Sequence, residues 1–325
     1  FTNPTHIQDA TLEALQQKRD VLGIAQTGTG KTGAFLIPII DNWLKNGPNS
    51  QALVVVPTRE LALQVEQEFR NFTRGLKLFS ATFIGGTNVG ADYKKLRRPV
   101  QLIVGTPGRL LDLYKREVLV LETINTLILD EFDRMLDMGF APDVERITQS
   151  MVSRSQTLLF SATLDKKQQP LIDELLHEPV EIKVSSGTST GDHIEQEIIR
   201  TDHGKGKFQS LLELVQNPEH EKVLVFAETK RGVDRLCVQL LQEGVKADQI
   251  HGDKSQNFRQ KALDKFKRGR IDVLVATDVA ARGIDVDDIS LVINYQVPND
   301  FETYIHRIGR TGRAGKKGKA ITLVD

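Results

Sequence analysis

Short runs of hydrophobic residues alternate along the chain with longer segments in which hydrophobic residues recur every three to four positions. The short runs predict buried strands, and the longer segments predict amphipathic helices such as residues 59–72 and 230–242. Buried strands that alternate with helices predict parallel sheets with helices on both faces, which is an α/β fold. Strands are expected at residues 20–24, 52–56, 78–84, 100–104, 126–129, 157–160, 222–226, 272–276, 291–295 and 320–324.

The length of 325 residues exceeds the size of one ordinary hydrophobic core and predicts two domains. Residues 185–192, Ser-Ser-Gly-Thr-Ser-Thr-Gly-Asp, are polar and contain glycine, which is typical of a flexible linker. We therefore expect one domain at residues 1–187 and a second at residues 188–325.

The composition is that of a globular protein, with 39% hydrophobic and 26% charged residues and no hydrophobic run long enough to span a bilayer. The formal net charge is zero, so charge alone does not indicate a nucleic-acid partner, and any such partner must be bound by local groups. The single cysteine, Cys237, lies in a helical hydrophobic pattern and is expected to be buried and inert. We expect a cytoplasmic protein without a membrane partner, and a nuclear location stays open.

Residues 25–32 have the sequence Ala-Gln-Thr-Gly-Thr-Gly-Lys-Thr and follow the first predicted strand. A glycine-rich turn between a strand and a helix predicts a phosphate-binding loop, in which backbone N–H groups surround phosphate oxygens. Lys31 adds a positive charge, Thr32 can offer its hydroxyl to Mg²⁺, and the helix dipole favours the same anion. The usual pattern begins with glycine, whereas this chain has Ala25. The loop predicts binding of a nucleoside triphosphate.

Other polar segments directly follow predicted strands, where parallel sheets place their ligand sites. A strand that ends in Asp130 and Glu131, downstream of a phosphate loop, supplies a carboxylate for Mg²⁺ and a candidate base for the attacking water. In the second half, residues 276–285 and 306–313 carry arginines that could reach a γ-phosphate bound by the first domain.

Taken in order, these motifs resemble those of the two-domain catalytic core of DEAD-box RNA helicases, over nearly all of the chain. The matching segments are residues 5–8, 25–32, 57–62, 106–109, 161–163, 277–285 and 306–313. The resemblance implies two tandem RecA-like domains and RNA-stimulated ATP hydrolysis, coupled by domain closure to local unwinding or remodelling of RNA duplexes. It also implies ATP and Mg²⁺ as ligands, RNA bound through its backbone, and a monomeric core.

The resemblance assigns residues to the ATP site. Gln8 is the expected adenine contact, Asp285 the ribose contact, and Glu131 the residue that orients or deprotonates the attacking water. The expected metal ligands are Thr32 and Asp130, the latter through water. The expected catalytic residues are Lys31, Asp130, Glu131, Arg310 and Arg313, the two arginines contacting the γ-phosphate in a closed state. The expected ATP-binding residues are Gln8, Ala25, Gln26, Thr27, Gly28, Thr29, Gly30, Lys31, Thr32, Gly283, Asp285, Arg310 and Arg313.

The resemblance also implies an RNA path and a set of residues that couple the two sites. The path needs few charged residues, because backbone N–H groups and hydroxyls can bind phosphates directly. The expected RNA-binding residues are Pro57, Thr58, Arg59, Gly85, Gly86, Thr106, Pro107, Gly108, Arg109, Thr229, Arg259 and Thr277. The expected coupling residues are Asp133, Ser161, Thr163, Arg282 and His306.

One position departs from the family pattern, because Phe132 stands where the family has alanine. We favour the interpretation that Phe132 packs into a hydrophobic pocket. The alternative is that it shifts the segment around Ser161 and alters how hydrolysis is coupled to RNA.

Two other functions stay open. A DNA translocase could share the same two-domain core, and an RNA clamp could bind ATP and RNA but turn over slowly because of Phe132. ATPase assays with RNA, without nucleic acid and with single-stranded DNA distinguish these functions from an RNA helicase.

Overall fold

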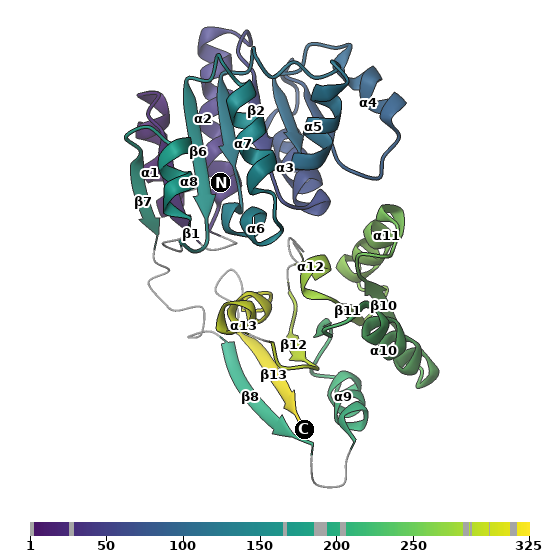
Figure 1. Cartoon of the computed structure of the whole chain (residues 1–325). Helices are drawn as coiled ribbons and strands as arrows, with labels where there is room; N and C mark the ends of the chain where they lie inside the picture. The colour runs from purple at the N-terminus through teal and green to yellow at the C-terminus, as the bar shows by residue number, and fades with distance from the viewer. Residues whose placement is uncertain are drawn as a thin grey trace. The chain divides into compact units, whose positions relative to one another are not determined.

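The computed structural model divides the chain into two compact units, residues 1–186 and 187–325 (Figure 1). The segment predicted as the linker, residues 185–192, lies outside the described residues. The structure describes residues 3–25, 29–164, 168–184, 194–201, 206–281, 286, 288–298, 300–312 and 317–325.

The first unit contains a seven-stranded parallel sheet with the strand order β3-β4-β2-β5-β6-β1-β7. Its strands are β1 (Val21–Ala25), β2 (Ala52–Val55), β3 (Ser80–Phe83), β4 (Leu102–Gly105), β5 (Thr126–Leu129), β6 (Gln156–Ser161) and β7 (Val180–Val184). Its helices are α1 (His6–Gln16), α2 (Lys31–Asn46), α3 (Arg59–Phe72), α4 (Val89–Leu96), α5 (Pro107–Lys115), α6 (Phe132–Asp137), α7 (Ala141–Ser150) and α8 (Gln169–Leu175).

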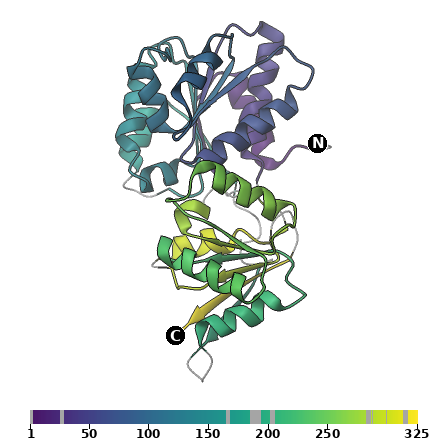
Figure 2. The same ribbon diagram turned by 90° about the vertical axis from the view of Figure 1, so that its right-hand side faces the viewer.

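Helices cover both faces of this sheet (Figures 1 and 2). Successive residues of a strand point to opposite faces, so a fully buried strand needs hydrophobic residues at every position. In β2, Ala52 and Val54 pack with α1, α2 and α3, whereas Leu53 and Val55 pack with α5, α6, α7 and α8. Because all strands run in the same direction, the segments that follow them lie together at the carboxyl ends of the strands.

The second unit contains a six-stranded parallel sheet with the strand order β10-β11-β9-β12-β13-β8. Helices α11, α12 and α13 pack on one face, and α9 and α10 pack on the other. The strands are β8 (Ile194–Arg200), β9 (Val223–Phe226), β10 (Ala247–Ile250), β11 (Val273–Ala276), β12 (Leu291–Asn294) and β13 (Gly318–Val324). The helices are α9 (Lys207–Gln216), α10 (Lys230–Gln242), α11 (Gln256–Lys267), α12 (Asp278–Ala281) and α13 (Phe301–Ile308).

The α/β fold with parallel sheets covered on both faces is confirmed, and each predicted strand overlaps an observed one. Helices α3 and α10 have the predicted bounds. Among the described residues, the hydrophobic pattern missed β7, β8 and β10, which all lie at sheet edges. An edge strand is buried less completely than a central one and therefore carries more polar residues, as the sequence IEQEIIR of β8 illustrates.

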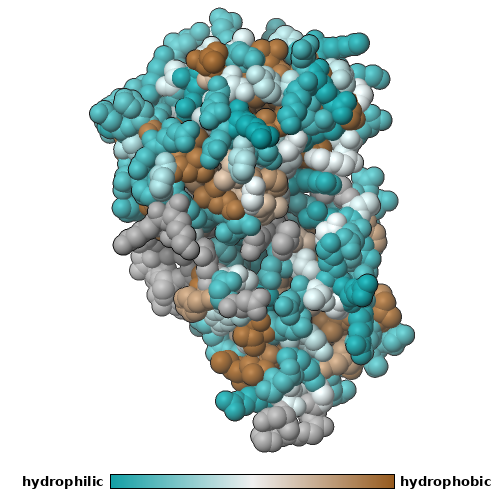
Figure 3. All heavy atoms as spheres, in the orientation of Figure 1, coloured by the Kyte–Doolittle hydropathy of each residue, from teal (hydrophilic) through white to brown (hydrophobic). Residues whose placement is uncertain are grey.

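The surface is mostly polar on the face drawn in Figure 3, where hydrophobic residues appear in small groups. Among the described residues, no helix is both long and apolar enough to cross a bilayer. Cys237 is buried on α10, as predicted, and burial raises the pKa of its thiol to about 11. The thiol is therefore protonated at neutral pH, which makes it a poor nucleophile.

Candidate functional site

The predicted phosphate loop connects β1 to α2 in the first unit. Gly30 has a φ of 91°, a left-handed conformation that glycine adopts without strain, and it precedes the first residue of α2. The N-cap residue Gly30 has no side chain with which to cap this helix, and the N-terminus of a helix favours an anion. Lys31 is only 6% exposed, and its Nζ donates a hydrogen bond to the Ala25 carbonyl oxygen at 2.9 Å. Gln26, Thr27 and Gly28 lie outside the described residues.

Gln8 joins the start of α1 to this loop. Its Oε1 accepts a hydrogen bond from the Thr5 N–H at 3.0 Å, and its Nε2 donates to the Gly30 carbonyl oxygen at 3.2 Å. A Cβ atom at Gly33 would lie 2.7 Å from the same Nε2, so glycine at that position gives the amide room. The predicted adenine contact is therefore held against the phosphate loop.

Asp130 and Glu131 follow β5 and are both buried, at 2% and 5% exposure. Asp130 Oδ1 accepts a hydrogen bond from the Glu131 N–H at 2.9 Å. Burial raises the pKa of Asp130 to about 6, and the nearby positive charge of Lys31 opposes that rise. Glu131 has a φ of 54°, and its Oε2 lies 2.6 Å from a guanidinium nitrogen of Arg134, a residue that the motif analysis did not single out.

Asp133 and the segment 161–163 meet beyond the ends of β5 and β6. Asp133 Oδ2 accepts hydrogen bonds from the backbone N–H groups of Ala162 and Thr163 at 3.1 and 3.0 Å, and from Thr163 Oγ1 at 3.2 Å. Ser161 Oγ accepts from the Asp133 N–H at 3.3 Å and donates to the Thr163 carbonyl oxygen at 2.6 Å. Three predicted coupling residues thus form one hydrogen-bonded group.

Phe132 is fully buried at the start of α6, within the hydrophobic cluster that includes α5, α7 and α8. This burial agrees with the packing interpretation of the residue. An effect of Phe132 on turnover stays a prediction.

The predicted RNA residues of the first unit lie after β2, β3 and β4, at the same edge of the sheet. Thr58 caps α3 by accepting a hydrogen bond from the Leu61 N–H at 3.3 Å, and Thr106 precedes α5, whose first residue is Pro107. The guanidinium of Arg59 packs against Gly85 and Gly86, and a Cβ atom at Gly86 would lie 2.6 Å from it. Gly108 is exposed and Pro57 is buried.

Arg109 occupies an internal network rather than an open surface. Its side chain is 8% exposed and contacts the fully buried Asp92 at 2.7 Å and Asp112 at 3.1 Å. It also donates to the Thr87 carbonyl oxygen at 3.2 Å. Arg109 therefore ties α5 to α4 and to the loop that follows β3. Motif analysis missed Asp92, which lies far from Arg109 in sequence.

In the second unit, predicted RNA residues follow β9 and β11 or lie on α11. Thr229 caps α10 by accepting a hydrogen bond from the Gly232 N–H at 3.0 Å, and Thr277 is 7% exposed after β11. Arg259 is half-buried on α11.

The other predicted residues of this unit belong to the segment 306–313. His306 lies on α13. Arg310 is 4% exposed, and its Nε donates a hydrogen bond to the carbonyl oxygen of His306 at 3.2 Å. Arg307, which motif analysis did not single out, contacts both carboxylate oxygens of Asp278 at 2.6 and 2.8 Å. In this unit, four further predicted residues lie outside the described part of the chain: Arg282, Gly283, Asp285 and Arg313.

Among the described residues, no group of three or more His, Cys, Asp or Glu side chains is arranged to hold a metal ion. Mg²⁺ in nucleotide sites typically takes one or two protein oxygens and fills its other positions with water and phosphate. The carboxylate of Asp130 and the hydroxyl of Thr32, in the first turn of α2, fit that donor set in kind.

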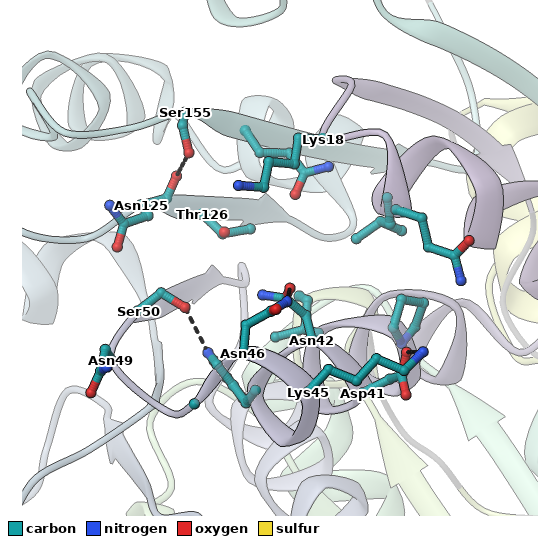
Figure 4. A pocket seen from close by; sticks show the side chains of 17 residues that line it. Lys18, Asp41, Asn42, Lys45, Asn46, Asn49, Ser50, Asn125, Thr126 and Ser155 are labelled. Atoms are coloured by element: carbon teal, nitrogen blue, oxygen red, sulfur yellow. Dashed lines mark hydrogen bonds and ion pairs between the residues drawn. The ribbon is translucent and has the colours of Figure 1, made fainter.

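A pocket of about 700 Å³ opens at the end of the first sheet where the strands begin, near the first residues of β5 and β6 (Figure 4). Most of the residues that line it are polar. Asn46 Nδ2 donates to Asn42 Oδ1 at 2.7 Å, and Trp43 Nε1 donates to Ser50 Oγ at 2.9 Å. Its lining shares no residue with the predicted ATP or RNA sites.

Comparison with known proteins identifies the family. The model of the DEAD/DEAH box helicase family matches residues 5–171, and that of the helicase conserved C-terminal domain matches residues 206–315. The DEAD-box ATP-dependent RNA helicase CshA of Bacillus subtilis is 44% identical over 324 residues, which cover 100% of this chain and 65% of that protein. The RNA helicase CrhR of Synechocystis is 42% identical over 325 residues, covering 100% of this chain and 66% of that protein. The chain belongs to the DEAD/DEAH box helicase family.

Solved structures agree with this assignment. A structure of Saccharomyces cerevisiae Dbp5 bound to RNA and ADP BeF3 has a TM-score of 0.87 at 32% identity, with 100% of this chain and 84% of that chain covered. Both units therefore have the fold of helicase domains. The chain spans 62–66% of the length of the first curated relatives that it matches.

Proposed function

We propose that this chain is the core of an ATP-dependent RNA helicase, which couples RNA-stimulated ATP hydrolysis to local unwinding or remodelling of RNA duplexes. The observation that carries the proposal is the buried arrangement of Asp130, Glu131 and Asp133, with Asp133 bonded to the segment 161–163. The groups proposed for hydrolysis and for transmitting its outcome would then lie within four consecutive residues. Family membership supports the same function, since relatives carry the name RNA helicase.

ATP binding would use the start of α2. Lys31, which donates to the Ala25 carbonyl oxygen in the structure, would transfer its hydrogen bond to phosphate oxygens. The N–H groups of the loop would surround the same oxygens, and Gln8 would present its amide to the adenine edge. Asp285 would contact the ribose.

Asp130 and Thr32 would hold Mg²⁺, which would offset the negative charge of the phosphates. Glu131 would orient the attacking water and accept its proton. Arg310 and Arg313 would act as arginine fingers from the second unit, stabilising negative charge on the transferred phosphoryl group. Turnover would therefore need residues from both units.

RNA binding would use side-chain hydroxyls and helix N-termini that follow the strands. Examples are the hydroxyls of Thr58, Thr106 and Thr229, which precede α3, α5 and α10. Such groups contact phosphates and sugars and carry no base specificity, so we expect RNA to be bound without sequence preference. This mode of binding also fits a chain with zero net charge. A cytoplasmic location and a monomeric core stay predictions.

ATPase assays test the proposal. We expect slow hydrolysis by the chain alone and strong stimulation by single-stranded or duplex RNA, but not by single-stranded DNA. Equal stimulation by DNA would favour a translocase. Binding of ATP and RNA without stimulated hydrolysis would favour an RNA clamp.

A further inference from the structure

A buried ion pair at the candidate catalytic centre joins Glu131, which precedes α6, to Arg134 in the first turn of that helix. Arg134 Nη1 lies 2.6 Å from Glu131 Oε2, and the two side chains are 3% and 7% exposed. Two charges removed from water are tolerated only when they are paired and hydrogen-bonded. The guanidinium therefore sets the position of the Glu131 carboxylate. In the proposed function, this carboxylate orients the attacking water.

The local backbone explains why Glu131 needs such a partner. Glu131 has φ 54° and ψ 51° and precedes the first residue of α6, so the packing of a regular helix does not fix its side chain. Its N–H group donates to Asp130 Oδ1, which orients the peptide but not the carboxylate. Arg134 lies three residues later, in the first turn of α6, and its guanidinium reaches the Glu131 carboxylate.

Arg134 is itself held from a second direction. Its backbone N–H donates to Asp133 Oδ1 at 3.0 Å, while Asp133 Oδ2 accepts from the segment 162–163. The Asp133 carboxylate is thereby occupied on both oxygens, and the guanidinium pairs with Glu131 instead. Arg134 thus pairs through its side chain with Glu131 and bonds through its backbone N–H to Asp133, whose other carboxylate oxygen contacts the coupling segment.

We propose that Arg134 is a positioning residue for Glu131, holding its carboxylate in the orientation from which it acts on water. This role rests on the proposed function. Two other roles predict different results. If the ion pair only stabilises the fold, breaking it would lower stability and leave kcat unchanged. If the ion pair restrains Glu131 and slows turnover, breaking it would raise kcat.

Kinetics of single variants separate these roles. We expect Arg134→Gln to lower kcat for RNA-stimulated hydrolysis by about 10- to 100-fold, an effect of the size found when a partner that orients a metal ligand is removed. The KM for ATP and the affinity for a non-hydrolysable ATP analogue should stay within about twofold, because Arg134 acts on the water and not on the nucleotide. Arg134→Lys should recover most of kcat by restoring the charge. Arg146→Gln, the same change at an exposed position of α7, is the matched control and should leave kcat unchanged.

A double-mutant cycle with Glu131→Gln decides whether Arg134 acts through Glu131. If it does, adding Arg134→Gln to Glu131→Gln lowers kcat no further. Thermal unfolding of the nucleotide-free protein gives an independent readout. Arg134→Gln should lower the midpoint by leaving a buried charge unpaired, and the double variant should recover part of that loss.

Four results would reject the role of Arg134: an unchanged kcat in Arg134→Gln, a higher kcat in that variant, multiplicative effects of the two substitutions on kcat, or no rescue by Arg134→Lys in a folded protein. By contrast, absence of RNA-stimulated hydrolysis in the unmodified chain would reject the proposed function itself.

Discussion

Lys31, Asp130, Glu131 and Asp133 lie in the interior of the first unit, each at most 6% exposed. Each has a defined hydrogen-bond or ion-pair partner, as buried ionisable groups require. The candidate phosphate loop and the candidate Asp-Glu pair could be proposed from the sequence because their residues are adjacent in it. Partners such as Arg134 and Asp92 could not be assigned in the same way, because pairing depends on which side chains the fold brings together. For Arg134, the three-residue spacing from Glu131 was the available signal.

Nucleotide choice should depend on Gln8. Its amide can both donate to and accept from an adenine edge, a combination that guanine does not match. We expect ATP to be hydrolysed in strong preference to GTP, and Gln8→Ala to weaken that preference. The measurement is kcat/KM for the two nucleotides, with Gln16→Ala, an exposed glutamine on the same helix, as the control. Equal use of ATP and GTP by the unmodified protein would contradict the role of Gln8.

Phe132→Ala should cost stability without raising activity. The side chain is fully buried, so truncation would leave a cavity and lower the free energy of unfolding by about 3–5 kcal/mol. Thermal unfolding and RNA-stimulated ATPase rates are measured on the same variant. Phe79→Ala, at a phenylalanine that is 49% exposed, should have a much smaller effect. Several-fold faster turnover with little loss of stability would show that Phe132 restrains coupling instead.

At the scale of elements, hydrophobic pattern predicted the central strands and failed at three edges. Strands β2 and β9 are buried at every position, so their sequences are unbroken hydrophobic runs. Strand β10, Ala-Asp-Gln-Ile, carries two polar residues in the middle and lies at the edge of the described sheet, where it pairs with β11. Residues 247–250 form a strand because β11 offers them backbone hydrogen bonds. Their own short, polar sequence does not indicate this pairing.

The contact between α4 and α5 gives a prediction at this scale. Arg109→Ala would leave Asp92 fully buried with Lys95 as its remaining ion-pair partner, at 3.0 Å. We expect a loss of about 3 kcal/mol in unfolding free energy, near the lower end for a broken buried pair because Lys95 remains. Thr106→Ala should instead weaken RNA binding with little change in stability. The measurements are thermal unfolding and RNA affinity. Weaker RNA binding by Arg109→Ala at unchanged stability would assign Arg109 to direct RNA contact.

At the scale of the whole molecule, the proposed reaction needs both units. The predicted phosphate loop belongs to the first unit, whereas Arg310 and Arg313 belong to the second. These arginines can act on ATP bound by the first unit only when the two units come together around it. Separate units should therefore bind their ligands but hydrolyse ATP slowly.

Arg310→Ala tests this requirement in the full chain. An arginine finger contributes about 10³-fold or more to the hydrolysis rate, so we expect RNA-stimulated kcat to fall by ~10³. Affinity for an ATP analogue in the absence of RNA should change little, because the phosphate loop belongs to the other unit. Arg270→Ala, at an exposed arginine of the second unit, controls for loss of charge and should leave kcat within about twofold. Because Arg310 is itself 4% exposed, the unfolding midpoint is measured alongside. A fall in kcat at an unchanged midpoint would support the finger. If Arg310→Ala retained full RNA-stimulated hydrolysis, Arg310 would have no part in catalysis. If the first unit alone hydrolysed ATP at the rate of the whole chain, the two-unit mechanism would be wrong.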